Sequence, residues 1–394
     1  MAAVIDALPA IQAPPASEVR HVPALPTLWP SLLSPLRPER APAFPLDARR
    51  TVPFYFARNA VFHAVRLLGL AGREVLVPAY HHGVEVAALA AAGAVPRFVR
   101  VDARMRLDLD HLVDSAGPRT GAVYVIHYAG MPQPMKAIES AARRIGVPII
   151  EDCALSLWSR DGNRPLGSTG DVAVFCFYKT VPVPNGGALV VNHRTVRGAL
   201  PRPVAPPIAS TLSHAVGSLL SNLAFRAGAP GLRFRAAARR TAQLVREVSG
   251  RQPISTGTSR FDPGAVHLGM SGLSRAILRR VDPEAVVAAR RRNWFLLHGS
   301  LRQLAEPVFT ELPAGVCPLF YPLACDHKAA VKARLAAAGI ETVDFWRTGH
   351  PLCAADEFPE VARLRERVLE LPIHQDLGPR EMAQVARAVA EALR

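Results

Sequence analysis

The chain has 394 residues and a mass of 42.4 kDa; 49% of its residues are hydrophobic and 20% are charged. This composition provides enough apolar side chains for a large core and excludes a wholly disordered protein. No apolar run is long enough to cross a bilayer, and the first residues lack the basic region of a secretory signal. We therefore expect a cytoplasmic protein without an integral membrane span.

Five cysteines are scattered along the chain without a CxxC pair. This spacing indicates neither a disulfide scaffold nor a structural zinc site, so we expect no metal.

The charge is strongly positive: 47 Lys and Arg against 32 Asp and Glu give a net charge of +15. Such a field attracts the phosphates of nucleic acid, anionic lipid or a nucleotide-linked metabolite. In the densest clusters, 233–246 and 279–292, arginine alternates with Ala, Leu and Val at helical spacing, which is typical of a solvated helix face. Because no zinc-finger spacing or RNA-binding motif accompanies them, we expect no nucleic-acid partner.

Residues 1–50 contain ten prolines, which predict an extended or irregular arm. From residue 52 to residue 192, short apolar runs alternate with helix-like segments, and this alternation predicts a mainly parallel α/β sheet. The last two runs are too closely spaced for a helical crossover, so we expect a looped or antiparallel connection at a site there. The expected strands are 74–78, 95–101, 122–126, 147–150, 172–177 and 188–191, and the expected helices are 59–68, 83–92, 109–115 and 134–145.

Residues 193–265 break this rhythm with a proline-rich stretch and then a serine-dotted apolar segment, 208–229. The segment could be an inserted helical hairpin, a dimer contact or a membrane-surface patch, and its serines favour a packed helix. A long helix is expected over 281–304. Beyond it, a strand at 318–324 and helices at 328–338 and 379–393 predict a small α+β domain. We thus expect an arm (1–50), a large domain (51–265) with an insertion at 193–265, and a C-terminal region (266–394).

The strongest chemical signal lies at the ends of two buried strands. The run 147–152 ends in Glu151 and Asp152, and Lys179 follows the run 172–177. Ligands bind at the carboxyl ends of strands in open α/β sheets. A lysine and a carboxylate there suit pyridoxal 5'-phosphate (PLP): the amine forms a Schiff base, and the carboxylate keeps the pyridine nitrogen protonated. The simpler alternatives are a loop acid that caps a helix for Asp152 and a surface lysine for Lys179.

Several blocks of the sequence resemble the DegT/StrS family of PLP-dependent sugar aminotransferases, within the aspartate-aminotransferase fold type. They keep the family's order from about residue 50 to the end, and only 193–265 has no counterpart. The blocks are Glu74-Val-Leu-Val-Pro-Ala-Tyr-His-His82, Val125-Ile-His-Tyr-Ala-Gly130, Val147-Pro-Ile-Ile-Glu-Asp-Cys-Ala154, Leu166-Gly-Ser-Thr-Gly-Asp-Val-Ala-Val-Phe-Cys-Phe-Tyr-Lys179, Gly186-Gly187, Met270-Ser271 and Arg367-Val-Leu-Glu-Leu-Pro-Ile-His-Gln375.

The resemblance implies a PLP-transferase fold of type I: a large domain with a mainly parallel mixed sheet and a smaller C-terminal α+β domain. It also implies that Lys179 is the catalytic Schiff-base lysine and that Asp152 binds the pyridine nitrogen. His82 stands where the family has an aromatic residue that stacks on the ring, and a buried core histidine is the alternative. The other implied cofactor-binding residues are Ala57, Arg58 and Asn59 in the phosphate loop, Cys176 in place of a phosphate-binding serine, and His267, near a position from which the partner subunit reaches the phosphate. His127 matches a family histidine on the strand beneath the cofactor, and a structural hydrogen-bonding role is the alternative there.

The chain also departs from the family pattern. The loop after Lys179 is about three residues shorter, Leu155 replaces Gln or His, and Arg58 replaces a small hydroxyl residue. The resemblance implies a homodimeric aminotransferase that moves an amino group from an amino acid, glutamate by family precedent, to a nucleotide-linked keto sugar. Two alternatives stay open: a PLP-dependent lyase or dehydratase, suggested by Leu155 and the short loop, and a non-catalytic member that binds an anionic polymer or membrane.

Overall fold

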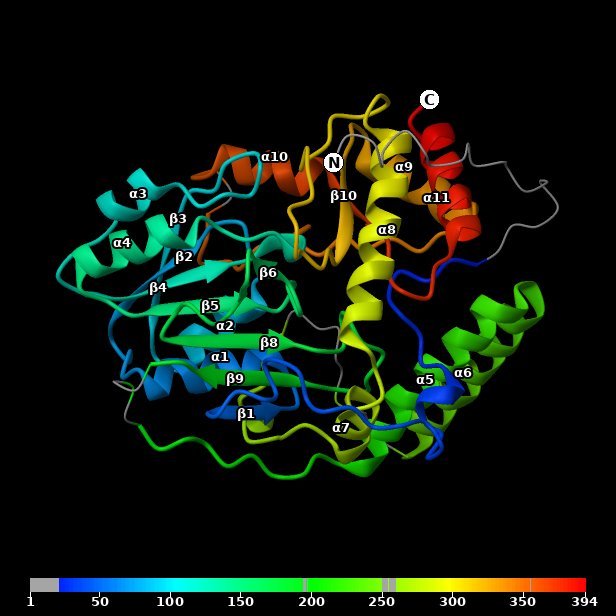
Figure 1. Ribbon diagram of the computed structural model, residues 1–394, viewed down its shortest axis with the longest axis horizontal. Coiled ribbons are helices and arrows are strands. Elements are labelled where there is room, and N and C mark those ends of the chain that lie inside the picture. The colour runs from blue at the N-terminus through cyan, green and yellow to red at the C-terminus, as the bar shows by residue number, and fades with distance from the viewer. Residues whose placement is uncertain (1–20, 194–195, 197, 250–253, 255–259, 355) are drawn as a thin grey trace.

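The computed structural model describes residues 21–193, 196, 198–249, 254, 260–354 and 356–394 (Figure 1). The first twenty residues of the expected arm therefore lie outside the described residues. From residue 21 to residue 50 the arm contains one short 3-10 helix, η3 (Pro30–Leu32), as its prolines predict. Among the described residues, no helix is both long and apolar enough to cross a membrane.

A seven-stranded sheet forms the centre of the molecule, with the strand order β1-β9-β8-β5-β4-β2-β3. The five strands from β8 to β3 in this order run parallel to one another, whereas β9 runs antiparallel to both β8 and β1. This arrangement confirms the mainly parallel mixed sheet and the antiparallel connection between its last two predicted strands. The strands are β1 (Thr51–Phe54), β2 (Glu74–Pro78), β3 (Val95–Val99), β4 (Thr120–Ile126), β5 (Ile149–Cys153), β8 (Val172–Cys176) and β9 (Gly187–Val191).

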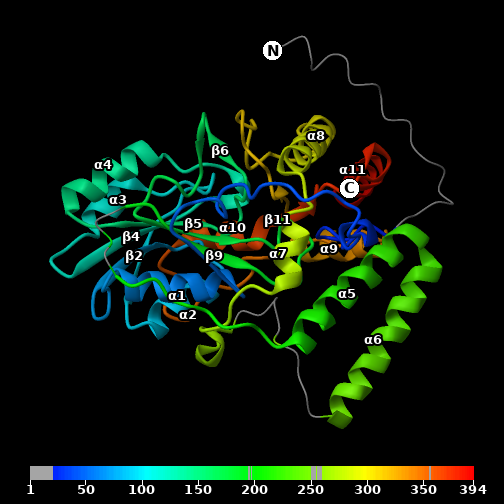
Figure 2. The same cartoon turned by 60° about the horizontal axis from the view of Figure 1, so that its bottom comes forward.

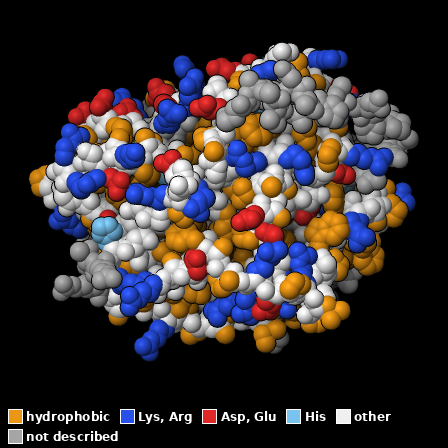
Figure 3. Space-filling model, viewed as in Figure 1, with side chains coloured by type: hydrophobic (Ala, Val, Ile, Leu, Met, Phe, Trp, Pro, Cys, Tyr) orange, Lys and Arg blue, Asp and Glu red, His pale blue; other side chains and the backbone are white. Residues whose placement is uncertain are grey.

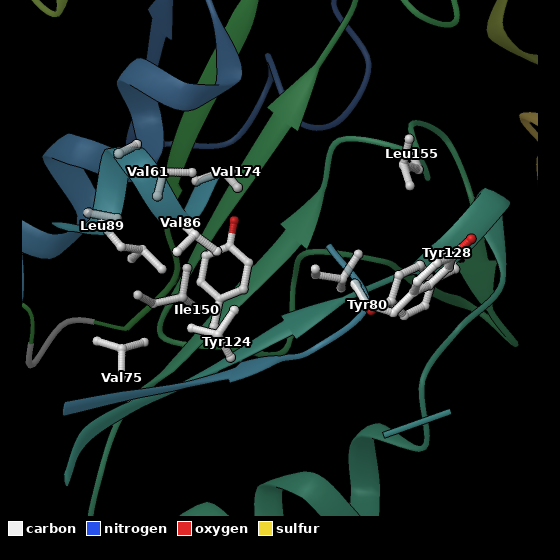
Figure 4. Packing of buried hydrophobic residues seen from close by; sticks show 14 of the residues in the cluster. Val61, Val75, Tyr80, Val86, Leu89, Tyr124, Tyr128, Ile150, Leu155 and Val174 are labelled. Carbon is white, nitrogen blue, oxygen red and sulfur yellow. The ribbon is translucent and has the colours of Figure 1, made fainter. Parts of the chain in front are cut away.

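Helices cover both faces of this sheet, and the alternation of side chains along β4 separates the two cores. Tyr124 joins the core under α1 (Ala57–Leu67) and α2 (Val84–Ala91), where Val61 and Val86 pack around it (Figure 4). Val123 and Val125 join the opposite core, under α3 (Leu109–Asp114) and α4 (Met135–Ile145). A strand buried on both faces explains why these runs lack polar alternation.

The C-terminal part builds a second core around β10 (Phe320–Ala324), which pairs antiparallel with β11 (Val368–Pro372). The long helix α8 (Pro283–Leu301) begins where Asp282 accepts hydrogen bonds from the backbone N–H groups of Glu284 and Ala285. The remaining elements are α7 (Gly272–Leu278), α9 (Lys328–Ala337), α10 (Pro359–Arg367), α11 (Pro379–Ala392), the two-residue strands β6 (Arg160–Asp161) and β7 (Arg164–Pro165), and the 3-10 helices η4 (Tyr128–Gly130) and η5 (Pro263–Ala265).

Residues 208–249 form a helical hairpin of α5 (Ile208–Ala227) and α6 (Ala229–Ser249), which projects from the body of the molecule (Figures 1 and 2). The buried face of α5 carries Ser210 and Asn222, so the serine-dotted segment is a packed helix, as expected. Gly231 lets the two helices approach, because a Cβ there would lie 2.5 Å from the carbonyl oxygen of Leu223. Lys and Arg side chains are spread over the face in Figure 3 instead of forming one patch.

Candidate active site

The predicted acid and lysine line the same cavity. Asp152 lies in β5, whose neighbour β8 runs parallel to it and leads into Lys179. Both side chains line a cavity of about 360 Å³ at the carboxyl ends of these strands, together with His82 and the first two residues of α1. The location is the one where open α/β sheets bind ligands.

The carboxylate of Asp152 is buried and held from two sides. Its Oδ2 accepts a hydrogen bond from the Tyr124 hydroxyl at 2.6 Å, and its Oδ1 accepts one from the backbone N–H of Ala154 at 2.8 Å. Burial, and then the nearby charge of Glu85, raises the pKa of Asp152. A cation beside this carboxylate would offset both effects, so the site suits a protonated pyridine nitrogen.

Glu85 is a residue of this cavity that the sequence reasoning missed. It lies in α2, is buried, and accepts a hydrogen bond from the backbone N–H of His82 at 2.8 Å. Burial raises its pKa. The sequence does point to it, because Glu85 is the single charged residue in the otherwise apolar helix Val84–Ala91.

Lys179 and His82 face an aromatic side chain, Phe345, which lines the cavity from the C-terminal part of the chain. The Nζ of Lys179 lies 4.8 Å from the ring centroid of Phe345, and the His82 ring packs edge-on against the same phenyl group. Burial and the charge of Lys179 lower the pKa of His82 to about 4, so its imidazole is neutral at physiological pH. Its Nδ1 is buried and has no hydrogen-bond partner among the described residues.

The N-terminus of α1 forms the other end of the cavity. Ala57 and Arg58 line it, and no side chain caps this helix end. Gly187 is needed here, because a Cβ at that position would lie 2.4 Å from the backbone nitrogen of Ala57. A helix N-terminus and the buried Arg58 guanidinium, which lies 3.5 Å from the centre of the Phe56 ring, suit an anion such as a phosphate.

Cys176 also lines the cavity, and burial raises the pKa of its thiol. Asn59 does not line it; its Nδ2 donates a hydrogen bond to the carbonyl oxygen of Ala265 at 2.8 Å. His267 is exposed and lies outside the cavity lining.

His127 lies outside the cavity lining and is fully buried. Its Nε2 is 3.0 Å from Glu151 Oε2, and its Nδ1 accepts a hydrogen bond from the backbone N–H of Gln133. Both ring nitrogens are therefore engaged, an arrangement that suits a structural role. The Sγ of Cys153 lies close by, but the backbone N–H groups of Gly167, Thr169 and Gly170 donate to the Glu151 oxygens.

Comparison with known proteins relates this site to a family. Residues 52–198 match the model of the DegT/DnrJ/EryC1/StrS aminotransferase family. The UDP-N-acetyl-3-dehydro-alpha-D-glucosamine 3-aminotransferase of Acidithiobacillus ferrooxidans is 27% identical over 352 residues, which span 85% of this chain and 82% of that protein.

Solved structures agree on the fold. An aminotransferase from Streptoalloteichus hindustanus is 25% identical with a TM-score of 0.67, covering 95% of this chain and 99% of that one. A protein from Streptococcus pneumoniae, solved in its PLP form, is 16% identical with a TM-score of 0.66, covering 95% and 100%. Residues 52–198 thus match the DegT/DnrJ/EryC1/StrS aminotransferase family, and nearly the whole chain shares its fold with the aminotransferase from S. hindustanus.

Proposed function

We propose that this protein is a PLP-dependent aminotransferase that moves an amino group from an amino acid, glutamate, to a keto sugar carried on a nucleotide. The observation that carries the proposal is the single cavity lined by Lys179 and Asp152. The family match and the A. ferrooxidans relative, whose name specifies a UDP-linked sugar, support the reaction and the substrate class.

The cavity fits PLP on three counts. A buried carboxylate with a raised pKa needs a cation nearby, a lysine amine lies in the same cavity, and an uncapped helix N-terminus with Arg58 offers an anion site. When bound, PLP supplies an electron sink that stabilises negative charge at the substrate carbon.

The residues of the chain would divide the remaining work. Asp152, held by Tyr124 and Ala154, would hold the proton on the pyridine nitrogen. The Nζ of Lys179 would hold the cofactor and, once displaced by the substrate amine, carry a proton between the substrate carbon and the cofactor carbon. Neutral His82 would lie against the ring, and Ala57, Arg58 and Cys176 would surround the phosphate.

The test is an absorbance spectrum of purified protein with added PLP, before and after glutamate. We expect a yellow protein that bleaches on glutamate without any acceptor, since an aminotransferase completes this half of its cycle alone. A dehydratase need not bleach. Lys179→Ala should lose both the colour and turnover, whereas Lys136→Ala, an exposed lysine on α4, should keep both. A colourless wild-type protein, or full turnover by Lys179→Ala, would refute the proposal.

A homodimer is part of the same proposal. His267 is exposed and lies outside its own chain's cavity lining, where it would be free to serve a partner's site. Size-exclusion chromatography with light scattering should give twice the chain mass of 42.4 kDa. A monomer that retains full turnover would contradict it.

A further inference from the structure

A second cavity adjoins the candidate active site on the side of the helical hairpin. It has a volume of about 680 Å³, within the range of small-molecule sites. Leu25 and Tyr178 line both cavities, and Tyr178 directly precedes Lys179 in the chain. We call this second cavity the hairpin groove. Its walls are the arm segment 23–27, the loop 182–184, the face of α5 from Ser213 to Ser221, Arg239 of α6, and Glu341.

The walls of the groove are fixed to one another by hydrogen bonds. The Oγ of Ser218 accepts a bond from the backbone N–H of Leu28 at 2.9 Å, and the Nδ2 of Asn222 donates to the Thr27 hydroxyl at 3.0 Å. Thr27 in turn donates from its backbone and its hydroxyl to Asp376 of the C-terminal core. Hydrogen bonds of the arm thus join the hairpin to the C-terminal part of the molecule, and they hold the walls of the groove in place.

The lining is polar where α5 faces it. Ser213, His214, Ser218 and Ser221 all line the groove from this helix and are half-buried. Serine hydroxyls can both donate and accept, so each can hold a sugar or phosphate oxygen beside its existing bond. Such a face suits a polar ligand better than an acyl chain.

The charge of the groove favours an anion. The negative charge of Glu341 is balanced by Arg235, whose guanidinium lies 3.2 Å from Glu341 Oε1. Arg239, one turn further along α6, is exposed and lines the groove. Because the acid is already paired, the described side chains around the groove present a net positive charge.

We propose that the hairpin groove binds the diphosphate and nucleoside of the acceptor, with Arg239 contacting the phosphates, so that the sugar reaches the cavity at Lys179. This inference rests on the proposed function, which supplies a nucleotide-linked acceptor. The hairpin begins at residue 208, beyond the matched residues 52–198. The hairpin, which lies beyond the residues that the family model matches, would therefore take part in binding the acceptor.

The test is isothermal titration of UDP, as the probe, into the PLP-loaded protein. We expect Arg239→Ala to weaken UDP binding about 10-fold to 100-fold, the usual effect of losing charge-assisted hydrogen bonds. Arg239→Lys should recover part of the affinity. Arg240→Ala, which removes the neighbouring exposed arginine on α6, is the matched control and should change the affinity less than about twofold.

Competition identifies what the groove recognises. Inorganic diphosphate should displace UDP from the wild-type protein and bind Arg239→Ala more weakly, whereas uridine alone should compete poorly. Equal losses in the alanine variants of Arg239 and Arg240, or no UDP binding to the wild type, would overturn the inference. The glutamate spectrum of the same wild-type preparation separates this failure from failure of the proposed function.

Discussion

Glu151 stabilises the loop that leads into β8, the strand before Lys179, so replacing Glu151 should lower the stability of the protein. The side chain is fully buried. Its Oε1 accepts hydrogen bonds from the backbone N–H groups of Thr169, at 2.7 Å, and Gly170, and its Oε2 accepts one from that of Gly167 at 2.9 Å. In Glu151→Gln, an NH2 group replaces one oxygen and faces donors that then have no acceptor. We expect the free energy of unfolding to fall by about 3–5 kcal/mol.

Thermal melts followed by circular dichroism measure this loss. Because the unfolding entropy scales with chain length, a chain of 394 residues should lose roughly 1.2 °C per kcal/mol, so the melting temperature should fall by about 4–6 °C. Although burial opposes it, hydrogen bonding to His127 and the backbone lowers the pKa of Glu151. A lowered folded pKa adds stability above the unfolded value and loses it as pH falls, so the difference from wild type should shrink in acid. Glu139→Gln, on α4, is the control. A shift no larger than that of Glu139→Gln at neutral pH would refute the reasoning.

Three further changes test other parts of the structure. Arg290 is buried and donates to the carbonyls of Leu319 and Thr180, so Arg290→Met should cost about 3–5 kcal/mol, and an unchanged melting temperature would contradict this. Burial raises the pKa of Glu370 from 4.5 to about 8, so the stability of the protein should fall as the pH rises from 4.5 toward 8. In Glu370→Gln, melting temperatures measured across these pH values should depend less on pH. His82→Phe should keep PLP absorbance and a pH–rate profile parallel to wild type above pH 5, because His82 is already neutral there; a lost titration step would disprove it.

The sequence predicts the buried strands well because each is a short apolar run. It does not predict β1, which has only four residues and contains Pro53. Proline lacks a donor, and β1 tolerates it because β1 is an edge strand whose only strand neighbour in the sheet is β9. β11 was missed for a different reason: Glu370 stands in the middle of its apolar run, and only the surrounding core shows that this acid is buried.

The candidate site divides in the same way. Asp152 and Lys179 could be found because each follows directly from a buried run, and strand ends collect at one edge of a parallel sheet. Phe345 could not be found from the sequence, because it lies in a C-terminal segment without a motif and only tertiary packing brings it to the cavity. For His127 the motif left a structural and a cofactor-binding role open, and only the structure shows that its ring contacts Glu151 and lies outside the cavity lining.

The place of β1 in the sheet has a consequence for synthesis on the ribosome. β1 emerges before every other strand, yet its one neighbour, β9, begins only at Gly187. Strands β2 to β5 can assemble while β1 is still unpaired. Because Pro53 lacks a backbone N–H, the unpaired β1 is a poor partner for incorrect strand pairing. A nascent chain halted before residue 187 should therefore expose its first strand to protease.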